Sequence, residues 1–192
     1  MALAICWAEV PSVCYILPAM AKAARAIIVE GDKILVMYRN KHGSEYFTLV
    51  GGQVADGETI EQGLSRELKE ETGLVATGAR QVFVENHAEP YNQQYIYVCE
   101  VAPHDDVAIQ ETSEEGYMNR LDANVHKPLW VDVASFEKLP FRTPALQAAI
   151  VYGLRKGFPT QPVDLSSTDY AALTKSQRTG LLGLPGRFLK RR

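Results

Sequence analysis

Cysteine is scarce in this 192-residue chain, which has three, and histidine is nearly as rare, with four. The cysteines (Cys6, Cys14 and Cys99) form no C-x-x-C pair, and the histidines are scattered, so no zinc-type ligand spacing is present. Three cysteines also leave one over from any disulfide pairing. We therefore expect reduced thiols and a cytoplasmic location.

Long apolar runs are missing too. Residues 1–21 are fairly apolar, but Glu9 and Pro11 interrupt the run, whereas a membrane-spanning helix needs about 20 consecutive apolar residues. The stretch also lacks the basic start of a signal peptide. We expect residues 1–21 to be an N-terminal extension, with Met20 as a candidate natural start, and we expect no membrane partner.

The sequence has no excess of positive charge. Its 20 basic and 23 acidic residues give a net charge of −3. Six basic residues and no acid lie between Lys175 and Arg192, so the rest of the chain carries −9. This balance argues against a dedicated nucleic-acid binder. The basic end has two readings, which are a solvated tail and a contact with RNA or another acidic surface.

The composition, with 46% apolar and 22% charged residues, suits one soluble domain with some extra length. The expected strands are residues 24–30 and 33–38, paired as a hairpin, followed by 46–50, 79–85, 94–101 and 129–133. The expected helices are residues 59–72, 134–138 and 144–156, with a long polar loop over residues 103–127. This order predicts a mixed α/β domain over residues 22–157. Residues 158–192 are expected to be a tail, loosely attached or docked in pieces.

The helix over residues 59–72 concentrates acidic side chains on one face. Glu67, Glu70 and Glu71 are spaced i, i+3 and i+4, which places their Cβ atoms roughly 5–6 Å apart. Ile60, Leu64 and Leu68 form an apolar stripe that should pack on the sheet. Two interpretations fit the helix alone, a solvated acidic face and a site for a hard divalent cation, which prefers several carboxylate oxygens.

The segment before this helix favours the cation site. Gly51, Gly52 and Gly57 flank a loop between strand and helix, where glycine allows the backbone to approach a phosphate closely. Glu58 lies near the helix N-terminus, where the helix dipole favours a negative side chain. Its carboxylate is placed to reach the same cation.

The segment from Gly52 to Leu74 resembles the Nudix box, G-x5-E-x7-R-E-U-x-E-E-x-G-U, in which U is aliphatic. All nine fixed positions match: Gly52, Glu58, Arg66, Glu67, Leu68, Glu70, Glu71, Gly73 and Leu74. The flanking strand order is also similar, so the resemblance covers roughly residues 22–157. It implies a helix–sheet–helix sandwich and a hydrolase that cleaves a nucleoside diphosphate linked to another moiety.

The resemblance also implies roles for individual residues. Glu70 and Glu71 are expected to be the principal Mg²⁺ ligands, with Mn²⁺ as a substitute, and Glu58 to complete the cluster. Glu67 is expected to be a further ligand or the base that activates water, oriented by Arg66. Hydrolysis would proceed by attack of water on phosphorus. A homodimer is compatible with the resemblance.

Several residues outside the box are candidates for the same site. An additional carboxylate is expected from the loop after residues 94–101, where the choices are Glu111, Glu114 and Glu115; a mobile acidic loop is the competing interpretation. Arg39 and Tyr46 are candidates for substrate contact, together with Gly51 and Gly52. Because side chains alternate along a strand, one of Tyr46 and Phe47 must face the core.

The sequence leaves the substrate open. Nucleoside triphosphates and nucleotide sugars are expected, with ADP-ribose and dinucleoside polyphosphates as alternatives. Pro90 resembles the family cue for ADP-ribose and Tyr91 the cue for dinucleoside polyphosphates, while a hairpin turn explains both residues without any substrate. A Nudix-fold isomerase and a nucleotide-binding module without activity are further alternatives, and the complete set of box glutamates favours hydrolysis over both.

Overall fold

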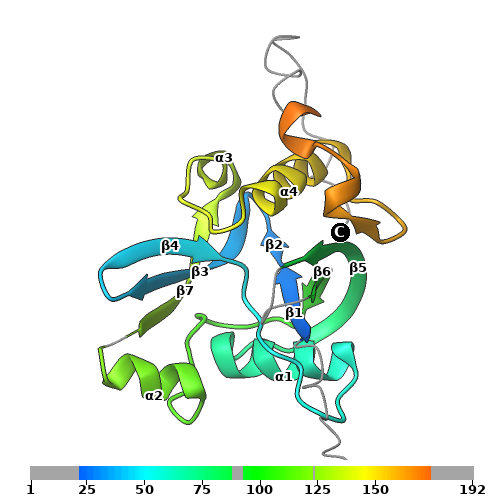
Figure 1. Ribbon diagram of the computed structural model, residues 1–192. Helices are drawn as coiled ribbons and strands as arrows, with labels where there is room; N and C mark the ends of the chain where they lie inside the picture. Colours follow the sequence, from blue (N-terminus) through cyan, green and yellow to red (C-terminus); the bar gives the residue numbers. More distant parts are fainter. Residues whose placement is uncertain (1–21, 88–92, 123, 174–192) are drawn as a thin grey trace, which may run out of the picture.

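Two β-sheets form the centre of the structure, and helices lie at both ends of them (Figure 1). The computed structural model describes residues 22–87, 93–122 and 124–173. The strands are β1 (Lys22–Ile27), β2 (Val29–Glu30), β3 (Lys33–Lys41), β4 (Ser44–Thr48), β5 (Ala76–Asn86), β6 (Gln93–Val101), β7 (Asn124–Asp132) and β8 (Val163–Asp164). The helices are α1 (Ile60–Thr72), α2 (Glu114–Arg120), α3 (Val133–Phe136) and α4 (Pro144–Lys156), with a 3₁₀ turn η1 (Leu165–Ser167).

The sheets mix parallel and antiparallel pairs. The first has the order β1-β6-β5-β8, in which β1–β6 and β5–β8 are parallel and β5–β6 is antiparallel. In the second sheet β3 is central: β7 runs along its whole length, while β2 and β4 pair with its first and last residues. The helix–sheet–helix arrangement expected from the sequence is confirmed, with α1 on one side and α4 on the other (Figure 1).

The expected first strand is divided between the two sheets, which corrects the simple hairpin prediction. β2 does form a tight hairpin with β3 around Gly31 and Asp32. The residues before it, up to Ile27, belong to the other sheet. They form β1, which pairs in parallel with β6. The apolar run could not reveal this division, because β1 pairs with β6, a strand that is distant in the sequence.

The expectation of a long loop over residues 103–127 is also wrong in part. It contains α2, whose N-terminus is capped by Ser113 through a hydrogen bond from the Gly116 amide (3.1 Å). The expected helix over residues 144–156 is confirmed, and α1 begins at Ile60 after its N-cap Thr59 and ends before Gly73. None of the helices in the described parts of the chain is long and apolar enough to cross a membrane.

Strand alternation builds two apolar cores, one on each face of the sheets. In β3, Ile34 and Val36 belong to the core beneath α4, whereas Leu35 and Met37 belong to the core beneath α1. β6 divides in the same way. Successive side chains of a strand point to opposite faces, so a strand that is buried on both faces is apolar throughout. Each helix is thereby anchored by its own core.

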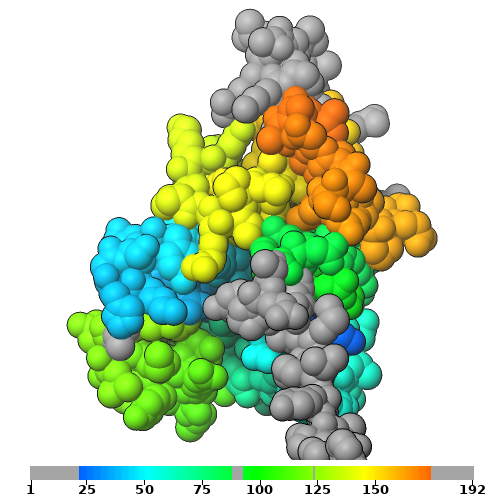
Figure 2. Space-filling model, in the orientation of Figure 1, coloured from blue at the N-terminus to red at the C-terminus, as the bar shows by residue number. Residues whose placement is uncertain are grey.

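The described part of the expected tail is docked on the core in pieces. Leu165 and Tyr170 are buried in the core beneath α4, and β8 extends the first sheet by pairing with Phe83 and Val84 of β5. Figure 2 shows this orange segment lying against α4 and the green end of β5. Packed residues of the domain therefore continue past residue 157.

Candidate active site

The local sequence fixes how α1 presents its acidic face. Thr59 and Gln62 form a capping box: the Gln62 amide donates to Thr59 Oγ1 (3.2 Å), and the Thr59 amide donates to Gln62 Oε1 (2.8 Å). Leu64 and Leu68 are buried against the sheets, as the apolar stripe predicts. The face that carries Glu67 and Glu71 is therefore held rigidly beside the loop that precedes the helix.

Three carboxylates meet at this face. Glu67, Glu71 and Glu115 each offer an oxygen, and these oxygens lie within 4.8 Å of one another. Glu67 is 8% exposed and Glu71 only 2%, while Glu115 from α2 is half-buried. We call these three residues the carboxylate cluster.

Burial changes the proton affinity of the cluster. The pKa of Glu71 is raised to about 8, mainly by burial; Arg25 and the Gly51 amide oppose the change, and the charges of Glu115 and Glu67 add to it. The pKa of Glu67 is also raised, mainly by burial, with Arg66 opposing the change. Desolvated like charges disfavour the ionised form unless a cation accompanies them.

Backbone hydrogen bonds bring α2 to the end of α1. The Ala108 amide donates to the Thr72 carbonyl (3.2 Å), and the Gln110 amide donates to the Glu70 carbonyl (2.8 Å). These carbonyls at the C-terminal end of a helix lack partners within it. The segment before α2 is thus tied to α1, and Glu115 follows it into the carboxylate cluster.

Arg66 links three glutamates of the box. Its Nε donates to Glu58 Oε1 (2.9 Å), and one terminal nitrogen donates to Glu67 Oε1 (2.9 Å) and Glu70 Oε2 (3.0 Å). The other terminal nitrogen donates to Glu58 Oε2 and the Gln53 carbonyl. These charge-assisted bonds raise the pKa of Arg66 and fix the carboxylate of Glu67 in one orientation.

The paired glycines are required by close approach. Gly51 has φ of 112° and is buried, and its amide donates to Glu71 Oε2 (2.5 Å). A Cβ on Gly52 would lie 2.3 Å from Glu67 Oε2. A side chain at Gly52 would therefore displace the Glu67 carboxylate.

The residues present fit a hard divalent cation. All three donors of the carboxylate cluster are oxygens, which Mg²⁺ prefers, and two of them, from Glu67 and Glu71, are buried together. Glu70 and Glu58 are held by Arg66 at the edge of this group. Arg66 and Arg25 offset part of the negative charge, and a divalent cation among the three oxygens would favour the ionised carboxylates further.

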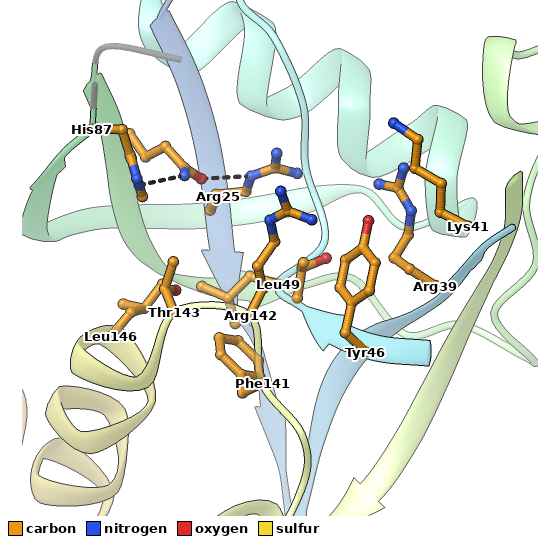
Figure 3. A pocket seen from close by; sticks show the side chains of 12 residues that line it. Arg25, Arg39, Lys41, Tyr46, Leu49, His87, Phe141, Arg142, Thr143 and Leu146 are labelled. Atoms are coloured by element: carbon orange, nitrogen blue, oxygen red, sulfur yellow. Dashed lines mark hydrogen bonds between the residues drawn. The ribbon is translucent and has the colours of Figure 1, made fainter. Parts of the chain in front are cut away.

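A cationic pocket lies beside the cluster. Its volume is about 370 Å³, and it is lined by residues of β1, β3, β4 and β6 and of the segment that begins α4. Four basic side chains, the pocket cations, line it: Arg25, Arg39, Lys41 and Arg142. In Figure 3 their charged ends gather at one end of the view, away from Phe141 and Leu146. Arg25 and Arg39 both act electrostatically on Glu71, so the pocket adjoins the carboxylate cluster.

The pocket side chains are positioned by neighbours. Arg25 Nε donates to Gln94 Oε1 (3.0 Å), whose amide nitrogen lies 2.8 Å from His87 Nε2 (Figure 3). The Arg142 guanidinium lies 5.0 Å from the centre of the Tyr46 ring. Tyr46 lines the pocket whereas Phe47 packs on the core, so alternation along β4 sends the two rings to opposite sides.

Comparison with known proteins decides the family. The family model of the NUDIX domain matches residues 20–150 of this chain. The chain belongs to the NUDIX family.

Relatives of this NUDIX chain agree in fold, and each matches part of it. An ADP-ribose pyrophosphatase of Methanocaldococcus jannaschii is 45% identical over 62 residues, 32% of this chain and 36% of that protein. A NAD-capped RNA hydrolase NudC of Pectobacterium carotovorum is 29% identical over 85 residues, 44% of this chain and 33% of that protein. The match thus spans about a third of each relative's length. A NUDIX hydrolase structure from Nitrosomonas europaea has a TM-score of 0.53 at 21% identity, covering 73% of this chain and 93% of that one.

The predicted site residues of this NUDIX domain do not all lie together. The structure brings Glu67 and Glu71 together and adds Glu115, one of three carboxylates expected from the loop. Glu111 and Glu114 are exposed and lie outside the cluster. Glu70, expected to be a principal ligand, accepts a hydrogen bond from Arg66 (3.0 Å), and its role as a ligand stays a prediction.

Sequence reasoning missed most of the cationic pocket. Arg39 and Tyr46 were candidates, but Arg25, Lys41 and Arg142 were not. A charged residue inside the apolar run of β1 was the only available signal for Arg25. Pro90 and Tyr91, residues 1–21 and the basic end after residue 173 lie outside the described residues, so the predictions made for them stay predictions.

Proposed function

We propose that this chain is a Mg²⁺-dependent pyrophosphohydrolase that cleaves a nucleoside diphosphate linked to another moiety, by attack of water on phosphorus. The observation that carries the proposal is the adjacency of the carboxylate cluster and the cationic pocket. An acidic cluster alone would repel a phosphate, and a cationic pocket alone would only bind one. Together they suit an anionic substrate held next to a catalytic cation.

Glu71 and Glu115, next to Glu67, would hold the cation, which would neutralise phosphate charge and lower the pKa of bound water. Glu70 and Glu58, bonded to Arg66, are placed to support the set. Every other contribution comes from the protein's own side chains. The pocket cations bind and orient the substrate, which lowers the entropic part of the activation barrier.

Glu67 is the proposed base. Its Oε1 accepts from Arg66, so its Oε2 is the atom that takes the proton from the attacking water. Burial raises the pKa of Glu67 towards the operating pH, where a general base is most effective. Arg66 positions this carboxylate and limits how far its pKa rises.

A panel of substrates with product identification tests the proposal. Nucleoside triphosphates, nucleotide sugars, ADP-ribose and dinucleoside polyphosphates are incubated with the full chain and Mg²⁺, and the products are separated by chromatography. We expect release of a nucleoside monophosphate or of pyrophosphate from at least one class, and none in EDTA. Silence across the panel, with binding retained, would instead support a nucleotide-binding module.

ADP-ribose is the second candidate within this class. The relative from Methanocaldococcus jannaschii is named for that activity and is 45% identical over the matched residues. Formation of AMP and ribose 5-phosphate at a higher kcat/KM than any triphosphate would favour ADP-ribose over the triphosphates.

A further inference from the structure

The described residues counter the pocket cations without an ion pair: Glu71 and Glu115 of the adjoining carboxylate cluster act on Arg39 electrostatically. None of the four pocket cations forms an ion pair within 4.0 Å in the described parts of the chain. No carboxylate is among the described residues that line the pocket. This is unusual in a chain with a net charge of −3, and it indicates that a ligand supplies the direct counter-charge.

Arg39 is the pocket cation with the clearest need for an anionic partner. Its Nε is buried and has no hydrogen-bond partner, while one terminal nitrogen donates weakly to Asn124 Oδ1 (3.3 Å). Burial is the main cause that lowers the pKa of Arg39; the charges of Glu71 and Glu115 oppose the change, and that of Arg25 adds to it. A buried donor without a partner costs free energy, which an anionic acceptor in the pocket would recover.

The number and spread of the cations exceed what the scissile pyrophosphate needs. A catalytic cation at the carboxylate cluster would already neutralise the phosphates of the bridge. Arg25 and Arg39 adjoin that cluster, whereas Arg142 comes from another part of the chain, the segment that leads into α4. Arg142 and Lys41 are exposed, so a ligand that enters the pocket from solvent can reach their charged ends.

We propose that the pocket recognises an additional phosphomonoester on the substrate, separate from the pyrophosphate bridge that is cleaved. The favoured substrates are thus pyrophosphate compounds whose nucleoside carries a further phosphate. This inference deepens the proposed function and rests on it for the cleavage step, although binding by the pocket does not depend on cleavage.

Arg142 is the residue to test, because backbone hydrogen bonds, and not its side chain, hold its loop in place. Its amide donates to the Phe47 carbonyl (2.9 Å), and the Phe47 amide donates to the Pro140 carbonyl (3.0 Å). The loop therefore keeps its place when the Arg142 side chain is shortened. Arg155 is a matched control, since it is an exposed arginine paired with Glu137 (2.8 Å) outside the pocket.

Binding is measured by titration calorimetry with the full chain in EDTA, so that activity plays no part. The probes are AMP, adenosine 2′,5′-bisphosphate and adenosine 3′,5′-bisphosphate, which differ only in the additional phosphate. We expect one bisphosphate to bind at least about tenfold more tightly than AMP, which corresponds to ~1.4 kcal/mol. Arg142→Gln should bring this ratio towards one, Arg142→Lys should keep part of it, and Arg155→Gln should leave it as in the wild type.

A second measurement separates this inference from the proposed function. NADH and NADPH differ by one phosphomonoester, and their kcat/KM values are compared with Mg²⁺ present. Equal cleavage of both, with equal binding of AMP and the bisphosphates, would overturn the inference and leave the hydrolase intact. Cleavage of neither, with a bisphosphate preference that Arg142→Gln abolishes, would retain the inference and count against the proposed function. A bisphosphate that does not bind, or a ratio that Arg142→Gln does not change, would overturn the inference.

Discussion

The carboxylate cluster and the cationic pocket are neighbours with opposite charge and opposite origins. Two members of the cluster come from a single helix, and the third is brought to it by hydrogen bonds to the end of that helix. The pocket is assembled from residues between Arg25 and Arg142, on strands of both sheets. Each region concentrates like charges, and each shifts a buried titratable group away from its charged form: the pKa of Glu71 rises to about 8 and that of His126 falls to about 4.

The carboxylate cluster and the cationic pocket require ligands of opposite charge. Burial is the main cause of both pKa changes, and like charges nearby add to it. A cation would relieve the first region and an anion the second. A phosphate substrate bound with a divalent cation meets both requirements together, which is the reason for treating the two regions as one site.

Removing the charge of Glu71 should produce the largest effect. With Mg²⁺, Glu71→Gln should lower kcat by roughly a hundredfold or more, since a catalytic metal contributes several kcal/mol and each ~1.4 kcal/mol is tenfold. In EDTA the same variant should be more stable than the wild type. A carboxyl whose pKa is raised on folding loses stability as the pH rises from its unfolded value, ~4.3, through about 8.

The measurement is thermal unfolding at pH 8 with EDTA and with Mg²⁺, beside kinetics on the best substrate. In EDTA we expect a gain of the order of 1–3 kcal/mol, or roughly 2–4 °C for each kcal/mol. Mg²⁺ should raise the Tm of the wild type but not of the variant. Glu100→Gln, which removes an exposed carboxylate from β6, is the control. A destabilised Glu71→Gln variant that still responds to Mg²⁺ would contradict the assignment.

Arg66→Lys should produce the next effect, because it keeps the charge but removes the geometry. Lysine cannot reproduce the fork that joins Glu58, Glu67 and Glu70. We expect kcat to fall by about 10–100-fold, as for other groups that orient metal ligands. The pH profile of kcat should also shift, since Arg66 lowers the pKa of the proposed base Glu67. Arg155→Lys makes the same exchange at an ion pair outside the site and should change neither quantity; full activity in Arg66→Lys would refute the positioning role.

Sequence reasoning succeeded where the signal is local. The helix of the box and the bounds of α4 depend on residues a few positions apart, and the expected helices are present. It failed on α2, because that short helix has little apolar periodicity and is held by its Ser113 cap and by contacts of Asn119 with the backbone of His126. The division between β1 and β2 was missed because it depends on the pairing of β1 with β6, which is distant in the sequence.

The cationic pocket could not be predicted either. Its members are far apart in the sequence and meet only because β1 runs beside β6 and the segment before α4 is bonded to β4. No spacing rule links Arg25 to Arg142. The roles of Glu70 as a principal metal ligand and of Glu115 as the additional carboxylate stay predictions as well.

The smallest expected effect concerns His126, which lies on the cationic side of the comparison. This histidine is 5% exposed, and its Nδ1 lies 2.7 Å from the Asn124 carbonyl. Burial, followed by the charge of Arg39, lowers its pKa to about 4. Because the unfolded histidine titrates near ~6.5, the unfolded chain takes up the proton first, so stability is lost as the pH falls from about 7 towards 4.

Urea unfolding at pH 7.5 and pH 5 measures this loss. The wild type should lose of the order of 1 kcal/mol more than His126→Gln over this interval, because glutamine does not titrate. His104→Gln is a control of opposite sign: a hydrogen bond to the Asp105 carbonyl raises the pKa of His104, so its stabilising effect is present at low pH and is lost as the pH rises. If His126→Gln showed the same pH dependence as the wild type, the pKa of His126 would not be lowered in the folded protein. The comparison between the two regions would then be wrong on the cationic side. A phosphate compound that fills the pocket should reduce the His126 effect, since it would neutralise Arg39 and so remove part of the repulsion.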